Sequence, residues 1–434
     1  MKKIISVILA AVLLTTVGMT FSAYAQKEDS TMFSDSDFLT AYGSLLKNEN
    51  GKTVLLRGTN LGGWLVYEEW MSAVVGAPAG RDMLDLLEKR FGADGAKQLL
   101  DSYQNNYITT EDFDTLLDLG FNCVRLPFWY ANLETDTPGE YDFSRLDWAV
   151  EQCASRGIYV ILDCHGLPGY QSIAHHSGKL SDCHLYDDSP EGERYREESV
   201  RLWQAVAEHY KDEPAVAAYD LMNEPMCDFN ENQDDAAMWK VYELLYRAVR
   251  EKDGKHIVIM EAVWNFDHLP DPARRGWKNV AYELHLYDPT DEAYKKIILR
   301  SELKGFCVPI LVGEFHPSSS DAHWDAILEL FNKNYINWTT WTYKGYSSWG
   351  DTDWFIYGKD RAPDLVDLNT DTFDTILEKW GENLRTSGFR TMGDVQALEK
   401  YAREDVHESI LAELTAFLQS VIYRIKSLGS RFFC

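Results

Sequence analysis

A short apolar segment in the middle of the chain, Ala217–Pro225, reads AAYDLMNEP. It has the composition of a buried strand, and a carboxylate, Glu224, stands at its end. A second segment of this kind, Val308–Phe315, reads VPILVGEF and carries Glu314 near its end. A carboxylate is costly to place at the edge of an apolar core. Two of them at the ends of separate strands therefore indicate one site built from both.

Six more apolar runs of strand type belong to the same pattern, and helical patterns alternate with all eight runs. Continuous apolar runs without polar alternation are typical of strands that are buried on both faces of a parallel sheet. Eight β/α units predict an α/β fold, a (β/α)8 TIM barrel. The eight expected strands are Val54–Asn60, Cys123–Phe128, Tyr159–His165, Val216–Asn223, His256–Glu261, Val280–His285, Ile310–Glu314 and Trp338–Tyr343.

The segments between these runs show helical spacing of apolar residues. Gly120 and Gly157 stand where two of these helices should end. A doubly wound sheet would carry a glycine-rich phosphate loop after its first strand, but Arg57–Trp64 reads RGTNLGGW and lacks that spacing. The clearest expected helices are Thr109–Leu119, Phe143–Ser155, Glu198–Tyr210, Met238–Lys252, Glu292–Leu303 and Ala322–Asn332.

The two ends of the chain differ from the barrel between them. Residues 1–25 have two lysines, an apolar run and a small-residue cleavage site, which is the pattern of a secretory signal peptide. An uncleaved membrane anchor is the alternative, although the apolar run is short for a span. Residues 26–385 should form the catalytic barrel, and residues 386–434 an amphipathic helical extension of one or two helices, with Gly429 as a C-cap. We expect a secreted or periplasmic protein.

Composition restricts the partners. The net charge of −27 disfavours nucleic acid, whose phosphates would be repelled. Beyond the signal peptide no run is long enough to cross a bilayer, so no membrane contact is expected after cleavage. The aromatic share of 13%, with 14 Trp, fits a large core or stacking on sugar rings. The seven cysteines are too few and too dispersed for a disulfide framework, and their pairing cannot be read from sequence.

Polar residues gather at the carboxyl ends of the expected strands, where TIM barrels build their active sites. A single histidine or arginine in a strand is usually structural, but a set at one level of the barrel indicates a site. The set comprises Arg125, His165, Asn223, Glu224, His285, Tyr287, Glu314 and Trp341.

This set resembles glycoside hydrolase family 5. In that family an Asn-Glu-Pro at the end of strand four holds the acid/base, and a Gly-Glu at the end of strand seven holds the nucleophile. The chain has Asn223-Glu224-Pro225 and Gly313-Glu314 at these places. The resemblance spans residues 54 to 380 and implies a retaining β-glycosidase.

A narrower likeness points to the fungal-type exo-β-1,3-glucanases within that family. It rests on Arg57–Leu65, Ile108–Phe113, His165–Gly169 and Trp341–Lys344. The chain departs from that branch at His175–Lys179 and in its C-terminal tail. These departures leave linkage and chain-end preference open.

The resemblance implies a role for each residue. Glu314 would attack the anomeric carbon, held ionised by Arg125 and oriented by Tyr287. Glu224 would start protonated, donate to the leaving oxygen and then act as base. Asn223, His165, His285 and Trp341 would bind the sugar. Retaining enzymes hold their two carboxyl groups about 5–5.5 Å apart, and we expect that separation here.

Two further groups of residues are candidates for a role in the site. His175, His176, Asp182, Cys183 and His184 match no standard zinc spacing, so we expect no metal or other cofactor, and sugar-contacting loop residues instead. The aromatic residues after the last strand form a sugar-stacking wall or a self-packed lid. They are Tyr346, Trp349, Trp354, Phe355 and Tyr357.

The leading hypothesis is a secreted enzyme that cleaves β-glucan or β-glucosides, with β-1,3-linked glucose at the non-reducing end as the first candidate. An endo-acting β-1,4-glucanase or hemicellulase is the enzymatic alternative. A glycan-binding protein without catalysis is the third hypothesis. It is disfavoured because both carboxylates are present. The partner is an oligo- or polysaccharide, and the oligomeric state stays open.

Overall fold

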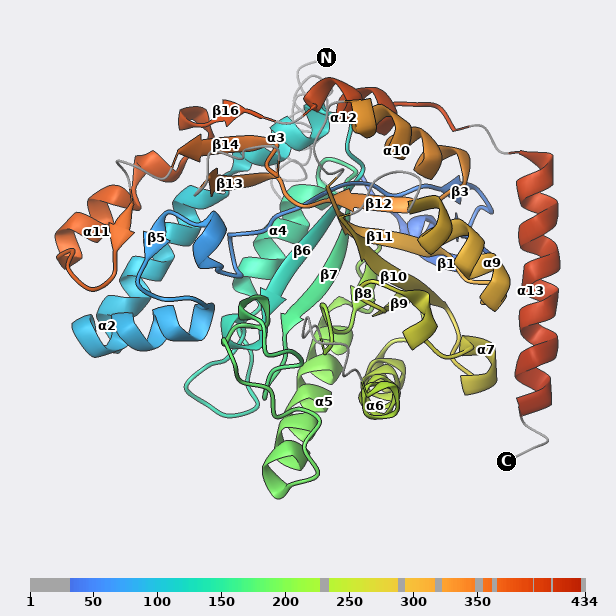
Figure 1. Ribbon diagram of the computed structural model, residues 1–434, viewed down its shortest axis with the longest axis horizontal. Helices are drawn as coiled ribbons and strands as arrows, with labels where there is room; N and C mark the ends of the chain where they lie inside the picture. Colours follow the sequence, from blue (N-terminus) through green and yellow to red (C-terminus); the bar gives the residue numbers. More distant parts are fainter. Residues whose placement is uncertain are drawn as a thin grey trace, which may run out of the picture.

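The protein was analysed as a computed structural model, which describes residues 32–226, 234–287, 293–316, 322–347, 354–360, 365–392, 394–406 and 409–430. Eight parallel strands close into a barrel (Figure 1). The predicted (β/α)8 fold is therefore confirmed. In barrel order the strands are β4 (Arg57–Asn60), β6 (Cys123–Trp129), β7 (Tyr159–Gly166), β8 (Val216–Asp220), β9 (Ile257–Glu261), β10 (Val280–Leu286), β11 (Ile310–Phe315) and β12 (Asn337–Thr340).

All eight predicted runs overlap these strands. The strands are buried on both faces, as expected for continuous apolar runs. Three predictions were too long, since β4 begins at Arg57 rather than at Val54, β8 ends at Asp220 rather than at Asn223, and β12 ends at Thr340 rather than at Tyr343. Register shifts occur after Phe128 and after Leu284. The second shift places His285 beside Glu314 on the neighbouring strand.

Helices surround the barrel. Thr109 caps the start of α3 through its contact with Asp112, and Ser189 caps the longer α5. The outer helices are α3 (Thr110–Asp118), α4 (Ser144–Ala154), α5 (Pro190–Tyr210), α6 (Asp235–Lys252), α7 (Pro272–Arg275), α9 (Arg300–Lys304) and α10 (Ala322–Lys333).

Two helical predictions need correction. The helix expected over Glu292–Leu303 is a π-helical segment, Tyr294–Leu299, that continues into α9. The longest helix, α2 (Gly80–Tyr107), was not among the expected helices. It bends at Gly92, whose φ of +74° lies outside the helical region. Its sequence is largely polar with a weak apolar stripe, so spacing alone did not reveal it.

A small antiparallel sheet closes the N-terminal end of the barrel. It consists of β1 (Leu39–Tyr42), β2 (Leu45–Asn48) and β3 (Thr53–Val54). Leu39 and Leu46 pack against the first residues of the barrel strands, among them Ile257 and Leu311. This end of the barrel is therefore filled by apolar side chains, and the opposite end holds the polar residues.

Further short elements follow β12. They are β13 (Lys344–Ser347), β14 (Tyr357–Asp360) and β16 (Arg390–Thr391) in one sheet, β15 (Val366–Asp367) paired with β5 (Val74–Val75), and α11 (Phe373–Lys379). Short 3₁₀ turns occur at Asp35–Asp37, Glu69–Met71, Tyr130–Asn132, His175–Ser177, Phe266–His268, Glu382–Leu384 and Thr386–Gly388.

The C-terminal extension forms two helices, α12 (Val395–Ala402) and α13 (Ile410–Ser430). The expected cap at Gly429 is wrong, because α13 continues to Ser430. Among the cysteines whose surroundings the structure describes, Cys123, Cys153, Cys164, Cys183 and Cys307 are free thiols. Cys227 and Cys434 lie outside the described residues. No described helix is long and apolar enough to cross a membrane.

Candidate active site

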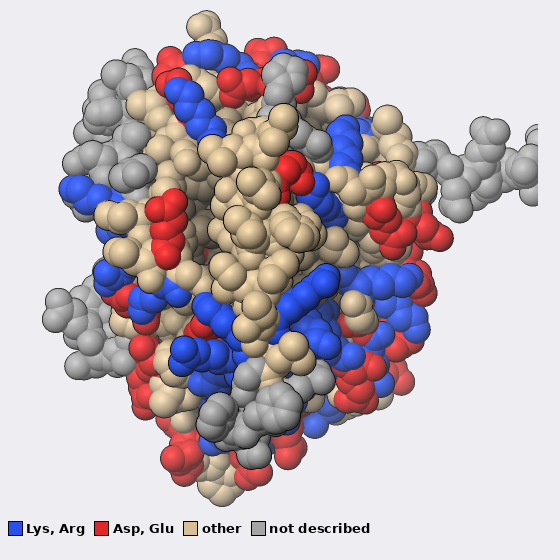
Figure 2. Space-filling view, turned by 90° about the vertical axis from the view of Figure 1, so that its right-hand side faces the viewer, with Lys and Arg blue, Asp and Glu red and all other residues tan. Residues whose placement is uncertain are grey.

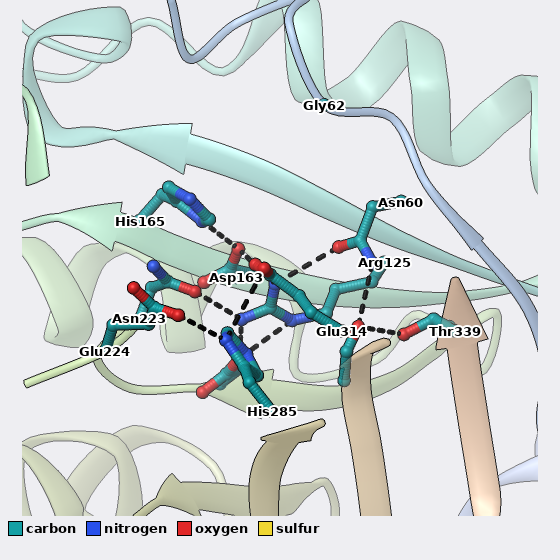
Figure 3. A network of polar contacts seen from close by, with 12 residues as sticks. Asn60, Gly62, Arg125, Asp163, His165, Asn223, Glu224, His285, Glu314 and Thr339 are labelled. Carbon is teal, nitrogen blue, oxygen red and sulfur yellow. Dashed lines mark hydrogen bonds and ion pairs between the residues drawn. The ribbon is translucent and has the colours of Figure 1, made fainter. Parts of the chain in front are cut away.

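The predicted site residues meet at the carboxyl end of the barrel (Figure 3). Arg125 lies in β6, His165 in β7, His285 in β10 and Glu314 in β11, while Asn223 and Glu224 follow β8. Tyr287 and Trp341 stand just beyond β10 and β12. All are buried or nearly so. Residues that are far apart in the sequence thus form one polar cluster.

One histidine nitrogen contacts both carboxylates. His285 Nδ1 lies 2.7 Å from Glu224 Oε1 and 3.4 Å from Glu314 Oε2. Because both distances start at the same atom, the two oxygens are no more than about 6.1 Å apart, which is below the separation of about 6.5–9.5 Å found between the carboxyl groups of inverting enzymes. The pair is 8% and 4% exposed, so both groups face the site from a mostly dry environment.

Glu314 accepts hydrogen bonds on both of its oxygens. Arg125 Nη1 donates to Oε1 at 3.0 Å, and the Tyr287 hydroxyl donates to Oε2 at 2.7 Å. Burial raises the pKa of Glu314 above its ordinary value, while the Arg125 charge acts against that rise. The contacts expected for Arg125 and Tyr287 are both present, and they leave Glu314 fixed in position with a stabilised negative charge.

Glu224 lies in a different environment. His285 contacts its Oε1, and His176 Nε2 lies 3.0 Å from its Oε2. Its backbone N–H donates to Glu261 Oε2 at 2.5 Å, and its φ is +41°, unusual for a residue other than glycine. Burial lowers the pKa of His285 to about 3 and that of His176 to about 4. Both rings are therefore neutral near pH 7, and no cation contacts Glu224 through them.

Arg125 is the centre of the site's charge network. Its guanidinium lies 3.1 Å from Asp163, 2.7 Å from Asp220 and 3.3 Å from Glu283, in addition to Glu314. Burial raises the pKa of Asp163 to about 7 and that of Asp220 to about 6. One cation cannot neutralise four carboxylates in a dry interior, so part of this cluster holds protons.

Comparison with known proteins identifies the family. A family model described as Cellulase (glycosyl hydrolase family 5) matches residues 85–347, more than half of the chain. The chain belongs to glycoside hydrolase family 5. It is 27% identical over 347 residues to a β-xylosidase of Phanerodontia chrysosporium, covering 71% of each chain. It is 27% identical over 295 residues to a glucan 1,3-β-glucosidase of Candida oleophila, covering 63% of this chain and 66% of that protein.

Solved structures share the fold. A rutinosidase from Aspergillus niger superposes with a TM-score of 0.53 at 17% identity, covering 71% of this chain and 91% of that one. A β-glucanase from Saccharophagus degradans, solved in complex with cellotetraose, has a TM-score of 0.50 at 19% identity and coverages of 75% and 88%.

Within this family 5 site, the remaining predicted residues lie around Arg125 and the carboxylate pair. Asn223 Oδ1 accepts from Arg125 at 2.9 Å, and His165 Nδ1 lies 2.6 Å from Asp163. The rings of His165 and Trp341 stack with centroids 5.5 Å apart and an angle of 10°. This stack forms a flat wall beside the carboxylates, suited to one face of a sugar ring.

Sequence reasoning missed the buried acids beneath this site, Asp163, Asp220, Glu261 and Glu283. Asp163 and Glu283 interrupt apolar strands, Asp220 and Glu261 end them, and each of the four is 0% exposed. That interruption was a usable signal, because a carboxyl group inside a buried strand needs a partner.

Glu68 was also missed. It follows β4, is 5% exposed, accepts from Trp70 Nε1 at 2.8 Å and lies 2.9 Å from His175. Burial alone would raise the pKa of Glu68, but the hydrogen bond from His175 lowers this pKa to about 2. The resulting carboxylate stays charged beside the cavity.

The candidate metal-binding residues lie in two different parts of the protein. His175 and His176 border the active site, whereas His184 contacts Asp182 and Asp187 at the exposed surface. Among the described residues, Glu224, Glu261 and His285 have ligand atoms close enough to hold an ion. Since His285 already contacts Glu224 directly, we assign no metal to them.

The expected aromatic group also divides. Tyr346 and Tyr357 pack against Phe389 and Tyr343, away from the carboxylates. Trp354 packs instead 5.0 Å from Tyr287 and 5.9 Å from Trp70, while Phe355 is buried in the same cluster. Trp349 lies outside the described residues. Packing against other protein rings is therefore observed for the described members of the set, while stacking on a sugar stays a prediction.

Proposed function

We propose that the chain is a retaining β-glycosidase that acts on β-glucan or β-glucosides, with β-1,3-linked glucose at the non-reducing end as the leading substrate. The observation that carries the proposal is the carboxylate pair on one His285 nitrogen, at 2.7 and 3.4 Å. The relative named glucan 1,3-β-glucosidase supports the choice of linkage.

The two displacement steps follow from the two environments. In the first, a Glu314 oxygen attacks the anomeric carbon, the glycosidic C–O bond breaks, and Glu224 gives its proton to the departing oxygen. In the second, Glu224 takes a proton from water, the hydroxide attacks the anomeric carbon, and the bond to Glu314 breaks. Glu314 is an ester until this second step releases it, and Glu224 is the base of that step.

Contacts around the cavity support exo action. Trp70, from the segment after β4, packs against Trp354 and Phe355, from the segment after β12. Glu68 and His175 form a charged pair on the same side. A wall of this kind would close one end of a substrate groove, and the Glu68 carboxylate would offer an acceptor for terminal sugar hydroxyls.

An endo-acting β-1,4-glucanase is the second candidate. It is favoured by the description of the matching family model, Cellulase, and by the fold shared with a cellotetraose-bound β-glucanase. We also propose secretion or export to a periplasm, on the N-terminal pattern of residues 1–25.

The test is a substrate panel of aryl β-glucoside, aryl β-xyloside, laminarin, lichenan and carboxymethyl cellulose, read by product size. Our proposal predicts glucose as the first product from laminarin, and a Glu314→Gln variant as the inactive control. A ladder of oligosaccharides from carboxymethyl cellulose would favour the endo candidate instead. Cleavage of the aryl xyloside alone would overturn the glucose assignment.

A further inference from the structure

The outward face of α13 carries nine of the 16 large apolar residues that are exposed in the described part of the chain. The exposed fractions of its apolar residues run from 37% at Val421 to 88% at Ile410. Of the residues of this helix whose exposure the structure describes, 410–428, the exposed polar ones are Thr415 and Arg424. Monomeric proteins rarely expose a patch larger than a few hundred Å² without a function for it. The apolar residues of this face are Ile410, Leu411, Leu414, Phe417, Leu418, Val421, Ile422, Ile425 and Leu428.

The opposite face of α13 holds the helix on the protein. Ala416 is fully buried, Glu413 pairs with Lys47 at 2.7 Å, and the Tyr423 hydroxyl donates to the Trp277 carbonyl at 2.6 Å. An ordinary surface helix turns its apolar side to the core and its polar side to water. In α13 the arrangement is reversed, because small and polar residues face the barrel.

Basic residues surround the C-terminal half of this apolar face. Figure 2, which looks at this side of the molecule, shows an uncharged stripe with a dense group of Lys and Arg across its lower part. Arg424 is exposed on α13, and Arg274, Arg275 and Lys278 are exposed on and after α7. The nearby acid Asp271 is already paired with Lys426 at 2.9 Å. In a chain of net charge −27, this concentration of cations is local to one face.

We propose that this face is a membrane-docking surface, in which α13 lies in the plane of a bilayer. Its apolar stripe would enter the boundary between headgroups and acyl chains, and the cations around it would contact anionic phospholipid headgroups. The expectation of no membrane contact after signal cleavage is untested, and this proposal departs from it. The helix adjoins β1, β2 and Trp277, all at the N-terminal end of the barrel, so the candidate active site faces away from the bilayer.

A second copy of the chain fits this face less well. Leu411, Leu414, Leu418, Val421, Ile425 and Leu428 do follow the alternating three- and four-residue spacing of a coiled-coil seam. The positions that flank such a seam usually carry complementary charges. Here they include Ile410, Phe417 and Ile422, and in an antiparallel pair Arg424 would face an uncharged part of the other copy. The wide apolar face with a basic border matches lipid better.

The test is flotation of the chain starting at Gln26, which retains every described residue, with two kinds of vesicle. One kind is pure phosphatidylcholine, and the other contains about one third phosphatidylglycerol. We expect the protein to float with the anionic vesicles and to bind the neutral ones at least about tenfold more weakly. Equal binding to both would overturn the role of the cations, and no binding to either would overturn the proposal.

Two variants sharpen the result. The double substitution Leu418→Ser and Ile425→Ser removes apolar contact and should weaken binding at least about a hundredfold. Leu117→Ser, which changes an exposed leucine on α3, is the matched control and should bind normally. Thermal unfolding checks that all variants are folded. If light scattering instead shows a dimer that only the double variant dissociates, without vesicle binding, the face belongs to a second copy.

Discussion

At the level of single residues, the unfolding free energy of the protein depends on whether the acids around Arg125 are protonated. Asp163 and Asp220 are fully buried, and both contact the same guanidinium. Burial raises the pKa of Asp163 from 3.8 to about 7, so the folded protein holds a proton there that the unfolded chain releases. Between these two values, raising the pH therefore costs stability.

Asp163→Asn tests this coupling. The wild type should lose unfolding free energy as pH rises from about 4 to 7, by more than the variant does, because asparagine holds no titrating proton. Urea unfolding at several pH values measures the difference between the two proteins. A wild type whose stability rises over this window relative to the variant would contradict the assigned sign.

Glu224→Gln tests the acid role through the leaving group. Glutamine keeps the size of the side chain but cannot donate a carboxylic proton. The variant should lose about 10²- to 10⁴-fold in kcat/KM on laminarin, and much less on a dinitrophenyl β-glucoside, whose leaving group needs no protonation. Equal losses on the two substrates would show that Glu224 is not the acid.

Most polar residues of the site could be predicted because they stand at the ends of apolar runs, where a barrel places its catalytic groups, whereas Arg125 lies inside its strand. Their mutual contacts could not. Asp163, Asp220 and Glu283 come from three different strands and converge on Arg125 only after the barrel closes. Long-range pairing of this kind leaves no local pattern in a single sequence.

At the level of elements, the packing of β4 against β6 requires a glycine. A Cβ on Gly58 would lie 1.7 Å from the backbone oxygen of Cys123, which cannot move without displacing its strand. Gly58→Ala should therefore destabilise the protein by about 3 kcal/mol or more. Gly254→Ala, where a Cβ meets nothing within 4 Å, is the control. The urea concentrations at which the two variants are half unfolded test this prediction, and equal midpoints would contradict the close approach of the two strands.

The barrel strands were predictable and the peripheral elements were not, for a physical reason. A strand buried on both faces is apolar along most of its length, as in β7 and β10, where Asp163 and Glu283 are the exceptions that the site uses. The two-residue strands β5 and β15 gain their pairing from tertiary contact and carry too few residues to show a period. The polar helix α2 likewise depends on its packing against the rest of the protein, so the spacing of its apolar residues did not predict it.

At the level of the whole molecule, the two ends of the barrel have different contents. The carboxyl end carries the polar site, while the other end carries the β1–β3 sheet and α13. The amphipathic tail was predicted from the sequence, but the direction of its apolar face was not. The spacing of apolar residues shows that a stripe exists and does not show whether it faces the barrel or the solvent.

A chain that ends at Val406 tests this separation. It lacks α13 and should keep kcat/KM for an aryl β-glucoside within about twofold, because catalytic residues of such barrels lie at the opposite end. Stability should fall slightly with the loss of the Lys47–Glu413 pair. A large loss of activity in a protein that still unfolds cooperatively would show that α13 supports the site.

The configuration of the first product tests the central claim most directly. Proton NMR can follow the hydrolysis of an aryl β-glucoside and record which anomer of glucose forms before mutarotation. Two carboxylates that meet at His285 Nδ1, at 2.7 and 3.4 Å, predict that the β-anomer forms first. If the α-anomer forms first, Glu314 is not the nucleophile of a double displacement.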